Sequence, residues 1–142
     1  MEEFLREKIV WKIIGSNINF LIDEEGYFYN NAANILTSKS ISLKSLIAFL
    51  NSKILEWYFK RIIFIEVEGG GIQMFNTVME RVPLPILPHN ISSNMEKTVT
   101  EIIKNPSGES IAIYSQSINE IIYRVYDLTN DEINYIENWK QA

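Results

Sequence analysis

The side chains that could do chemistry in this chain form no complete catalytic set. His89 is the single histidine and follows Pro88 in an expected loop, and the Gly-x-Ser-x-Gly turn that would present a serine nucleophile to it is missing. Glu66 and Glu68 are expected on one face of a strand, where two like charges are typical of a solvated edge. The sequence therefore predicts no catalytic residue and a chain that is not an enzyme by itself.

Metal and cofactor sites lack the residue types they need. With no cysteine and one histidine, the chain cannot build a conventional zinc site. The acidic segment 23–25 has too few oxygen ligands for a calcium loop and is interpreted as a solvated turn. Gly69, Gly70 and Gly71 match no nucleotide-binding motif, and they predict either a bulge or wide turn, or a close approach of the main chain to a ligand backbone. We expect no metal and no cofactor in this chain.

Length and charge set the class of protein. A chain of 142 residues fits one domain that buries a core without disulfides. The net charge is −5; residues 1–90 hold nine basic and ten acidic side chains, whereas residues 91–142 hold four and eight. Duplex DNA binding draws on Lys and Arg, so the chain alone is expected to bind weakly. The absence of cysteine favours a reducing cytoplasm, and no apolar run is long enough to cross a bilayer.

Short strands are predicted in the N-terminal third, which must position any polar residues there. Residues Ile9 to Ile14 are mostly apolar and β-branched, which favours a strand. Phe20 to Ile22 and Tyr27 to Tyr29 flank an acidic segment closed by Gly26, which predicts a hairpin whose glycine takes a positive φ. A further short strand is predicted at Ile35 to Thr37.

A long amphipathic helix is predicted over residues 43–60. Ser42 is its expected N-cap, and apolar residues recur at three- and four-residue steps along one face. At a rise of about 1.5 Å per residue, such a helix covers one face of a small sheet. Ile62 to Val67 is then predicted as a buried strand with Ile72 to Phe75 as its partner, and Pro83 to Pro88 end the unit near residue 90.

A helical extension is predicted beyond residue 90. Ser93 with Glu96 forms a predicted capping box at its start. Thr129 with Glu132 forms another before a last short helix. Both signals stand before apolar residues at helical spacing, so this part of the chain is expected to be entirely helical.

The expected fold class is therefore α+β. Residues 1–90 form a β-rich core, a small and mostly antiparallel sheet backed by one long helix, and residues 91–142 form a helical C-terminal extension that packs on this core or on a partner. The aromatic side chains of the first part are interpreted as core rather than as stacking platforms for single-stranded nucleic acid: Trp11, Trp57, Tyr58, Phe59 and Phe64.

The order of these elements carries a family resemblance. An opening strand, a hairpin, a helix with a Leu-Asn-Ser segment, a strand, a glycine-containing stretch and a Pro-x-Pro close correspond here to Ile9 to Ile14, Phe20 to Tyr29, Leu50 to Ser52, Ile62 to Val67, Gly69 to Phe75 and Val82 to Pro85. In this order the chain resembles the Taq-type specificity domain, the C-terminal target-recognition module of adenine-specific DNA methyltransferases and type II restriction-modification enzymes. Val125 to Thr129, followed by Asp131 to Ile133, is similar to the ending common in these enzymes.

The resemblance implies a division of labour between two domains. A separate methyltransferase domain or subunit, with S-adenosylmethionine as its cofactor, flips out and methylates the adenine, while this module reads bases in the major groove of double-stranded DNA. The base-contact candidates are Lys12, Asn17, Asn19, Lys39, Arg61, Gln73 and Asn76. Lys60 and Arg81 are expected to meet phosphates, and Gly69, Gly70 and Gly71 to let the main chain come close to the DNA backbone.

An alternative function is a protein-interaction or assembly module of such a complex, without DNA binding of its own. The acidic extension would then pack on the methyltransferase or on a second copy in a homodimer. Tyr135 and Trp139 suit such a contact, and they suit equally well a position over the core of this domain. In that case each base-contact candidate is an ordinary solvated side chain. Enrichment of a short motif from a duplex library, weakening as salt rises, distinguishes the first function from the second.

Overall fold

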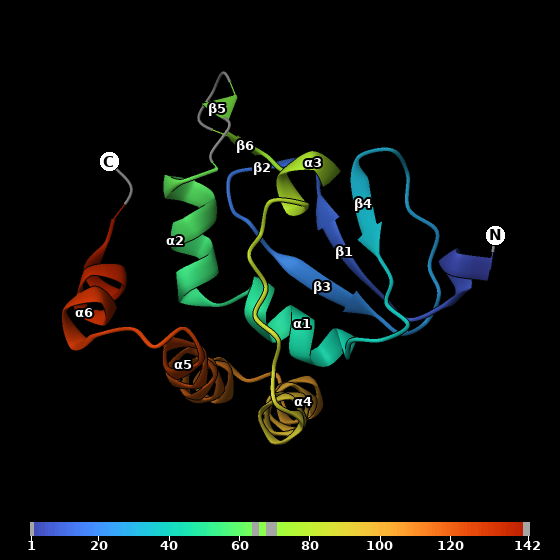
Figure 1. Cartoon of the computed structure of the whole chain (residues 1–142). Helices are drawn as coiled ribbons and strands as arrows, with labels where there is room; N and C mark the ends of the chain where they lie inside the picture. Colours follow the sequence, from blue (N-terminus) through green and yellow to red (C-terminus); the bar gives the residue numbers. More distant parts are fainter. Residues whose placement is uncertain (1, 64–65, 68–70, 141–142) are drawn as a thin grey trace.

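The computed structural model describes residues 2–63, 66–67 and 71–140, and it places two small sheets beside a layer of helices (Figure 1). The elements are η1 (Glu2–Leu5), β1 (Lys8–Lys12), β2 (Ile14–Gly15), β3 (Phe20–Asp23), β4 (Ala33–Leu36), α1 (Leu43–Leu50), α2 (Lys53–Arg61), β5 (Glu66–Val67), β6 (Gly71–Gln73), α3 (Asn76–Met79), α4 (His89–Lys104), α5 (Gly108–Val125) and α6 (Asn130–Asn138). The fold class is α+β with antiparallel sheets, as predicted.

The first sheet has the strand order β3-β1-β4, and all its pairs are antiparallel. Its register sets Trp11 opposite Phe20 and Asn34. Ile9, Trp11 and Phe20 are buried in the core that the sheet shares with the helices. Successive side chains of a strand point to opposite faces, so Ile9 and Trp11 lie on the same face of β1. This is the face of the sheet that the helices cover.

The second sheet has the order β2-β6-β5, and its strand β2 follows β1 directly in the chain. Ile14 pairs with Gln73, and the Met74 N–H donates to the Ile13 carbonyl at 2.6 Å. The Trp11 Nε1–H donates to the Met74 carbonyl at 2.9 Å. The predicted strand of residues 9–14 is thus split between two sheets, and a buried tryptophan joins them.

The predicted hairpin of residues 20–29 is wrong. β3 pairs with β1, whereas Tyr27 to Tyr29 lie in the connection to β4 and form no strand. The positive φ at Gly26 is confirmed, at 80°. The turn at Gly26 does not bring the aromatic residues that follow it back alongside β3.

The predicted helix of residues 43–60 is two helices, α1 and α2. The Ser42 side chain caps α1 as predicted, accepting from the Ser45 N–H. The break comes at Asn51, whose side chain accepts from the Phe20 N–H at 3.0 Å and donates to the Phe20 carbonyl at 2.9 Å. Ser52 then caps α2 by accepting from the Leu55 N–H. Asparagine and serine compete for main-chain groups in this way, and the apolar periodicity continues across the break.

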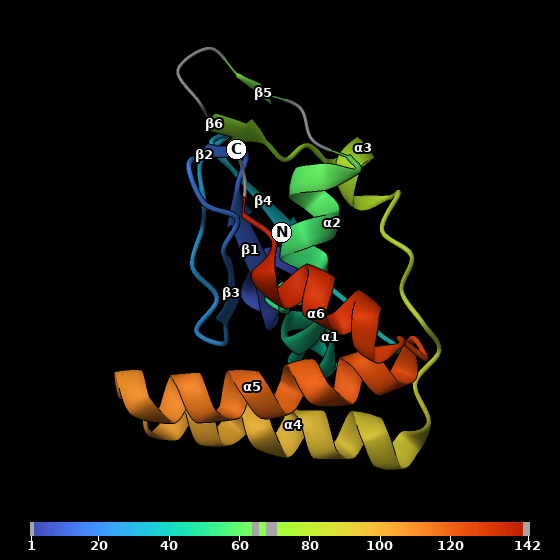
Figure 2. The ribbon, with the colours of Figure 1, turned by 90° about the vertical axis from the view of Figure 1, so that its left-hand side faces the viewer.

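The helical extension packs on the core rather than apart from it. α4 and α5 run side by side beneath α1, and α6 lies beside α2 (Figures 1 and 2). Met95 of α4 and Ile122 of α5 are fully buried in the same hydrophobic cluster as the first sheet and α1. Their packing makes one continuous core across the predicted boundary near residue 90.

The helix starts of the extension were predicted with mixed success. α4 begins at His89 with Pro88 at its N-cap, so the predicted capping box of Ser93 and Glu96 is wrong, and His89 is not in a loop. Pro88 offers no side-chain acceptor to the first N–H groups of α4, so this helix begins without a side-chain cap. The capping box of Thr129 and Glu132 is present as predicted.

The predicted strand of residues 62–67 is wrong for residues 62 and 63, which form no strand. The described strand is β5, and it pairs with β6 as expected of its predicted partner. Ile62 is exposed and Ile63 is buried before it, while residues 64–65, and with them Phe64, lie outside the described residues. Of the aromatic residues predicted as core, Trp11 and Phe59 are buried, whereas Trp57 and Tyr58 are partly buried against the cluster. In the described ranges, no helix is long and apolar enough to span a membrane.

Candidate nucleic-acid interface

Most candidate base-reading residues lie at one end of the molecule, which we call the second-sheet end. It comprises the second sheet, the connection between β2 and β3, α3 with residues 80–81, the last residue of β1 and the last turn of α2. Figure 2 shows it opposite α4 and α5, with the β5-β6 ribbon outermost. Antiparallel pairing explains the gathering, since the end of β1 lies where β3 and β4 begin.

Lys12 ends β1, and Asn19 immediately precedes β3. Each stands one residue beyond the paired Trp11 and Phe20, and both side chains are exposed. Asn17 is also exposed, in the short connection between β2 and β3. Buried aromatic residues therefore anchor the strand ends, while the polar side chains beside them point to solvent.

Gln73 and Asn76 flank the buried Met74. Gln73 ends β6 opposite Ile14, with a half-buried side chain, and Asn76 is the exposed first residue of α3. The Met74 carbonyl accepts from Trp11 Nε1–H and, at 3.3 Å, from Asn34 Nδ2–H. The backbone that carries both amides is thus fixed to the first sheet by buried hydrogen bonds.

The cations of the second-sheet end differ in how free they are. Arg61 and Arg81 are exposed and form no ion pair with a described carboxylate. Lys60 donates to Glu56 at 2.7 Å, the pairing expected from their spacing, and its side chain is only 12% exposed. Gly71 opens β6, whereas Gly69 and Gly70 lie outside the described residues, as does the side chain of Glu66. Lys12, Arg61 and Arg81 are therefore the accessible cations described at this end.

Lys39 lies away from the other candidates. It follows β4, at the sheet end where β1 begins. A polar pocket of about 370 Å³ is lined there by Lys39, Arg6, Lys44 and Glu96 among others. Lys44 also pairs with Glu24 at 3.2 Å. The structure brings six of the seven base-contact candidates to the second-sheet end and leaves Lys39 at the opposite end of the strands.

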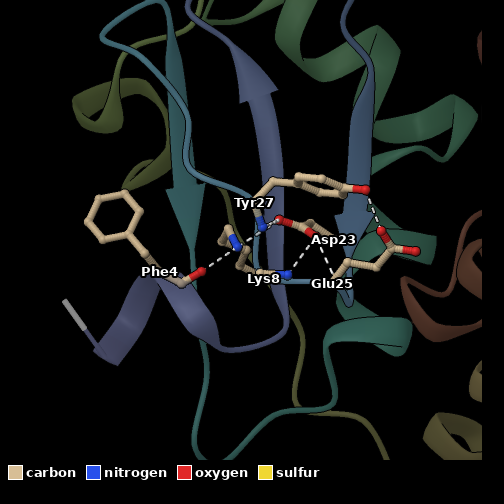
Figure 3. Close-up of polar contacts among 6 residues, drawn as sticks. Phe4, Lys8, Asp23, Glu25 and Tyr27 are labelled. Atoms are coloured by element: carbon tan, nitrogen blue, oxygen red, sulfur yellow. Dashed lines mark hydrogen bonds and ion pairs between the residues drawn. The ribbon is translucent and has the colours of Figure 1, made fainter.

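A buried ion pair missed by the sequence prediction holds the N-terminal segment to the first sheet (Figure 3). Lys8 Nζ lies 2.7 Å from Asp23 Oδ2, and both side chains are at most 4% exposed. Lys8 also donates to the Phe4 carbonyl at 2.7 Å. Asp23 Oδ1 accepts from the main-chain N–H groups of Glu25 and Gly26. The interpretation of segment 23–25 as a solvated turn is therefore wrong for Asp23.

The environment of Asp23 favours its charged form. Burial by itself raises the pKa of the carboxyl, but the hydrogen bond and charge of Lys8, with the main-chain donors of Glu25 and Gly26, outweigh it and leave the pKa below the ordinary value of 3.8. An aspartate that opens a turn ending in glycine is a sequence signal for hydrogen bonds from the main-chain N–H groups of that turn to the aspartate side chain. Nothing in the sequence separately indicates Lys8.

Among the described residues, no group of three or more His, Cys, Asp or Glu side chains is placed to hold a metal ion.

Comparison with known proteins found that residues 1–84, more than half of the chain, match the family model of the TaqI-like C-terminal specificity domain. No curated protein matches the chain. The matched range contains both sheets and all nine candidate side chains. The chain therefore belongs to the TaqI-like C-terminal specificity domain family, with a specificity role in a restriction-modification-related protein.

Proposed function

We propose that this chain is the sequence-specific DNA target-recognition domain of an adenine-specific DNA methyltransferase or restriction-modification enzyme. It reads bases in the major groove, and a separate domain or subunit carrying S-adenosylmethionine methylates the adenine. The observation that carries the proposal is the gathering of Lys12, Asn17, Asn19, Gln73 and Asn76 at the second-sheet end of a specificity domain. Amide and cationic side chains are the groups that distinguish adenine and guanine edges.

The shape of this end supports the proposal. The major groove is about 12 Å wide and admits a two-stranded β-ribbon. β5 and β6 form such an antiparallel ribbon, and they extend beyond the first sheet in both views (Figures 1 and 2). Met74 and Trp11 fix the backbone beneath the ribbon. Base reading requires such a rigid support, because a misplaced amide loses its hydrogen bonds.

The charge of this end supports base reading more than strong phosphate binding. Its accessible described cations are Lys12, Arg61 and Arg81, and Lys60 is already paired. Since much of duplex affinity comes from phosphate neutralisation, most of it must come from the catalytic domain. The division suits a module that supplies discrimination and leaves tight binding to its partner.

Selection from a duplex library at low and raised salt tests the proposal. The chain should enrich a motif of a few base pairs at low salt, with weaker binding at higher salt. Gln73→Ala should relax the preference at one position by about 1–3 kcal/mol. Arg81→Ala should weaken all sequences alike and lower the salt slope by about one.

Arg124→Ala is the matched control for the loss of one cation. Arg124 is exposed in the last turn of α5, in the helical pair opposite the second sheet, so its loss should leave the motif and the salt slope nearly unchanged. No enriched motif at low salt would contradict DNA reading by this chain. Equal effects of the Gln73 and Arg81 variants would contradict the assigned roles.

The alternative function is that of a protein-interaction module, and a groove between α2 and α6 favours it.

A further inference from the structure

A groove of about 340 Å³ lies between α2 and α6. Figures 1 and 2 show α6 beside α2, on the side away from the sheets. Its lining is mainly apolar and aromatic, with two carboxylates: Ile54, Trp57, Leu128, Asp131, Glu132, Tyr135 and Ile136. The Trp57 and Tyr135 rings meet edge to face at 6.3 Å between centroids. A concave apolar surface with a few polar groups at its edge is the usual form of a binding site.

α6 is held firmly enough for the groove to exist before any partner binds. Ile136 is buried in the core, and Tyr123 of α5 donates to Glu137 at 2.5 Å. Burial, followed by the hydrogen bond and charge of Glu137, raises the pKa of Tyr123 well above its ordinary value of 10.0, so the donor keeps its proton at neutral pH. A preformed groove lowers the ordering cost of binding.

Trp57 contributes to the groove through its ring. Its Nε1–H has no hydrogen-bond partner among the described residues, but the atom is buried and is not open to a docked partner. The ring lines the groove and packs edge to face on Tyr135. Aromatic rings of this kind attract a cation that carries an apolar stem.

The charge at the groove excludes a polyanion. Glu132 is engaged by Thr129 in the capping box, whereas Asp131 is exposed and forms no ion pair with a described residue. Residues 91–142 hold eight acidic and four basic side chains. DNA phosphates are therefore repelled here, while the aromatic pair and Asp131 attract a cation that carries an apolar stem.

We propose that the groove between α2 and α6 docks a segment of a partner protein through an apolar residue followed by an arginine or lysine. The apolar side chain rests on Ile54 and Leu128, and the cation meets Asp131 and the ring of Trp57. This contact goes beyond DNA reading and lies on a different surface. A basic partner fits a complex on DNA, because a catalytic domain that supplies the phosphate contacts must itself be basic.

Titration of the whole ¹⁵N-labelled chain with blocked dipeptides tests the proposal. Acetyl-Leu-Arg-amide carries the required cation and apolar side chain, and acetyl-Leu-Glu-amide is the matched anionic probe. The chain has three tryptophans, so three indole N–H signals report separately. The signal of Trp57 should shift with millimolar Leu-Arg peptide, those of Trp11 and Trp139 should move less, and the Leu-Glu peptide should move none.

Three variants locate the contact. Asp131→Asn should weaken the Leu-Arg peptide about two- to fivefold, as expected of a partly exposed ion pair. Asp127→Asn removes the same charge just before α6 and outside the groove; asparagine tolerates its positive φ of 53°, so peptide affinity should stay unchanged. Trp57→Phe keeps an apolar wall but offers the cation a weaker aromatic face, so affinity should fall about twofold, followed through the amide signals of α6. Thermal unfolding checks that each variant folds.

The other outcomes overturn the proposal. Equal shifts with both peptides would mean apolar partitioning without charge recognition. Equal effects of Asp131→Asn and Asp127→Asn would mean a general field of the acidic extension. A dimer that Asp131→Asn dissociates on gel filtration, with no peptide shift of Trp57, would assign the groove to a second copy of this chain. None of these results bears on DNA selection, so the proposed function is tested separately.

Discussion

The family-matched part and the helical extension are stabilised in different ways. The β-rich part depends on specific polar contacts over long sequence distances, such as Trp11 to Met74 and Asn51 to Phe20. The extension depends mainly on apolar faces and helix caps, with Met95 and Ile122 fully buried, although Asn119 also accepts from the Lys53 N–H and Tyr123 donates to Glu137. Specific polar contacts fix the direction of a backbone, whereas apolar packing tolerates variation. In the proposed function, the part that aims side chains at DNA is the part in which such directional contacts join the strands.

Lys8→Met, in the β-rich part, is the change with the largest expected effect on the free energy of unfolding. It leaves the Asp23 carboxylate buried without its cation, so the free energy of unfolding should fall by about 3–5 kcal/mol. Lys44→Met breaks the exposed pair with Glu24 and should cost at most about 1 kcal/mol. Urea unfolding measures both. Similar losses for the two variants would show that the buried pair is no more important than a surface one.

Met95→Ala is the corresponding change in the extension. The side chain is fully buried, and its truncation should lower the free energy of unfolding by about 2–5 kcal/mol. Ile113→Ala, at a position 59% exposed, is the control and should change it by about 0.5 kcal/mol or less. Because the core is continuous, circular dichroism and tryptophan fluorescence should report one transition. Two transitions would support the predicted division at residue 90 as separately folding units.

Acid should produce the smallest of these effects. The pKa of Asp23 is lower in the folded chain than its ordinary value of 3.8, so its stabilisation is present above that pH and is lost as pH falls through the folded pKa. The wild type should therefore lose part of its stability below about pH 4. In Asp23→Asn this contribution should be missing, so its stability should vary less with pH over the same range. Unfolding in urea at a series of acid pH values measures the difference, and parallel curves would contradict it.

The sequence predicted best what depends on local patterns. The caps at Ser42 and Thr129, the glycine turn at Gly26 and the gathering of helices at the C-terminal end all follow from residues close together in the chain. The fold class and the family followed from the order of such elements. Six base-contact candidates came together because antiparallel pairing brings strand ends to one edge.

The sequence could not predict what tertiary contacts decide. Asn51 divides a continuous apolar periodicity because its amide finds Phe20, which lies 31 positions away. Asp23 leaves its expected solvated turn because Lys8 lies opposite it in the register of β1 and β3. The separate position of Lys39 follows from the length of β4 and from the strand direction, which residue types alone do not encode. Each of these three misses is a long-range effect on a correct local preference, whereas the wrong capping box at Ser93 and Glu96 was a local misinterpretation.

The side chain of Asn51 has a further consequence for β3, which forms one border of its sheet. Its amide occupies both the N–H and the carbonyl of Phe20 on the side away from β1. Exposed borders of this kind invite a strand from another molecule, and natural proteins commonly block them. By occupying these groups at the first residue of β3, the helix break also keeps neighbouring molecules from extending the sheet at that point.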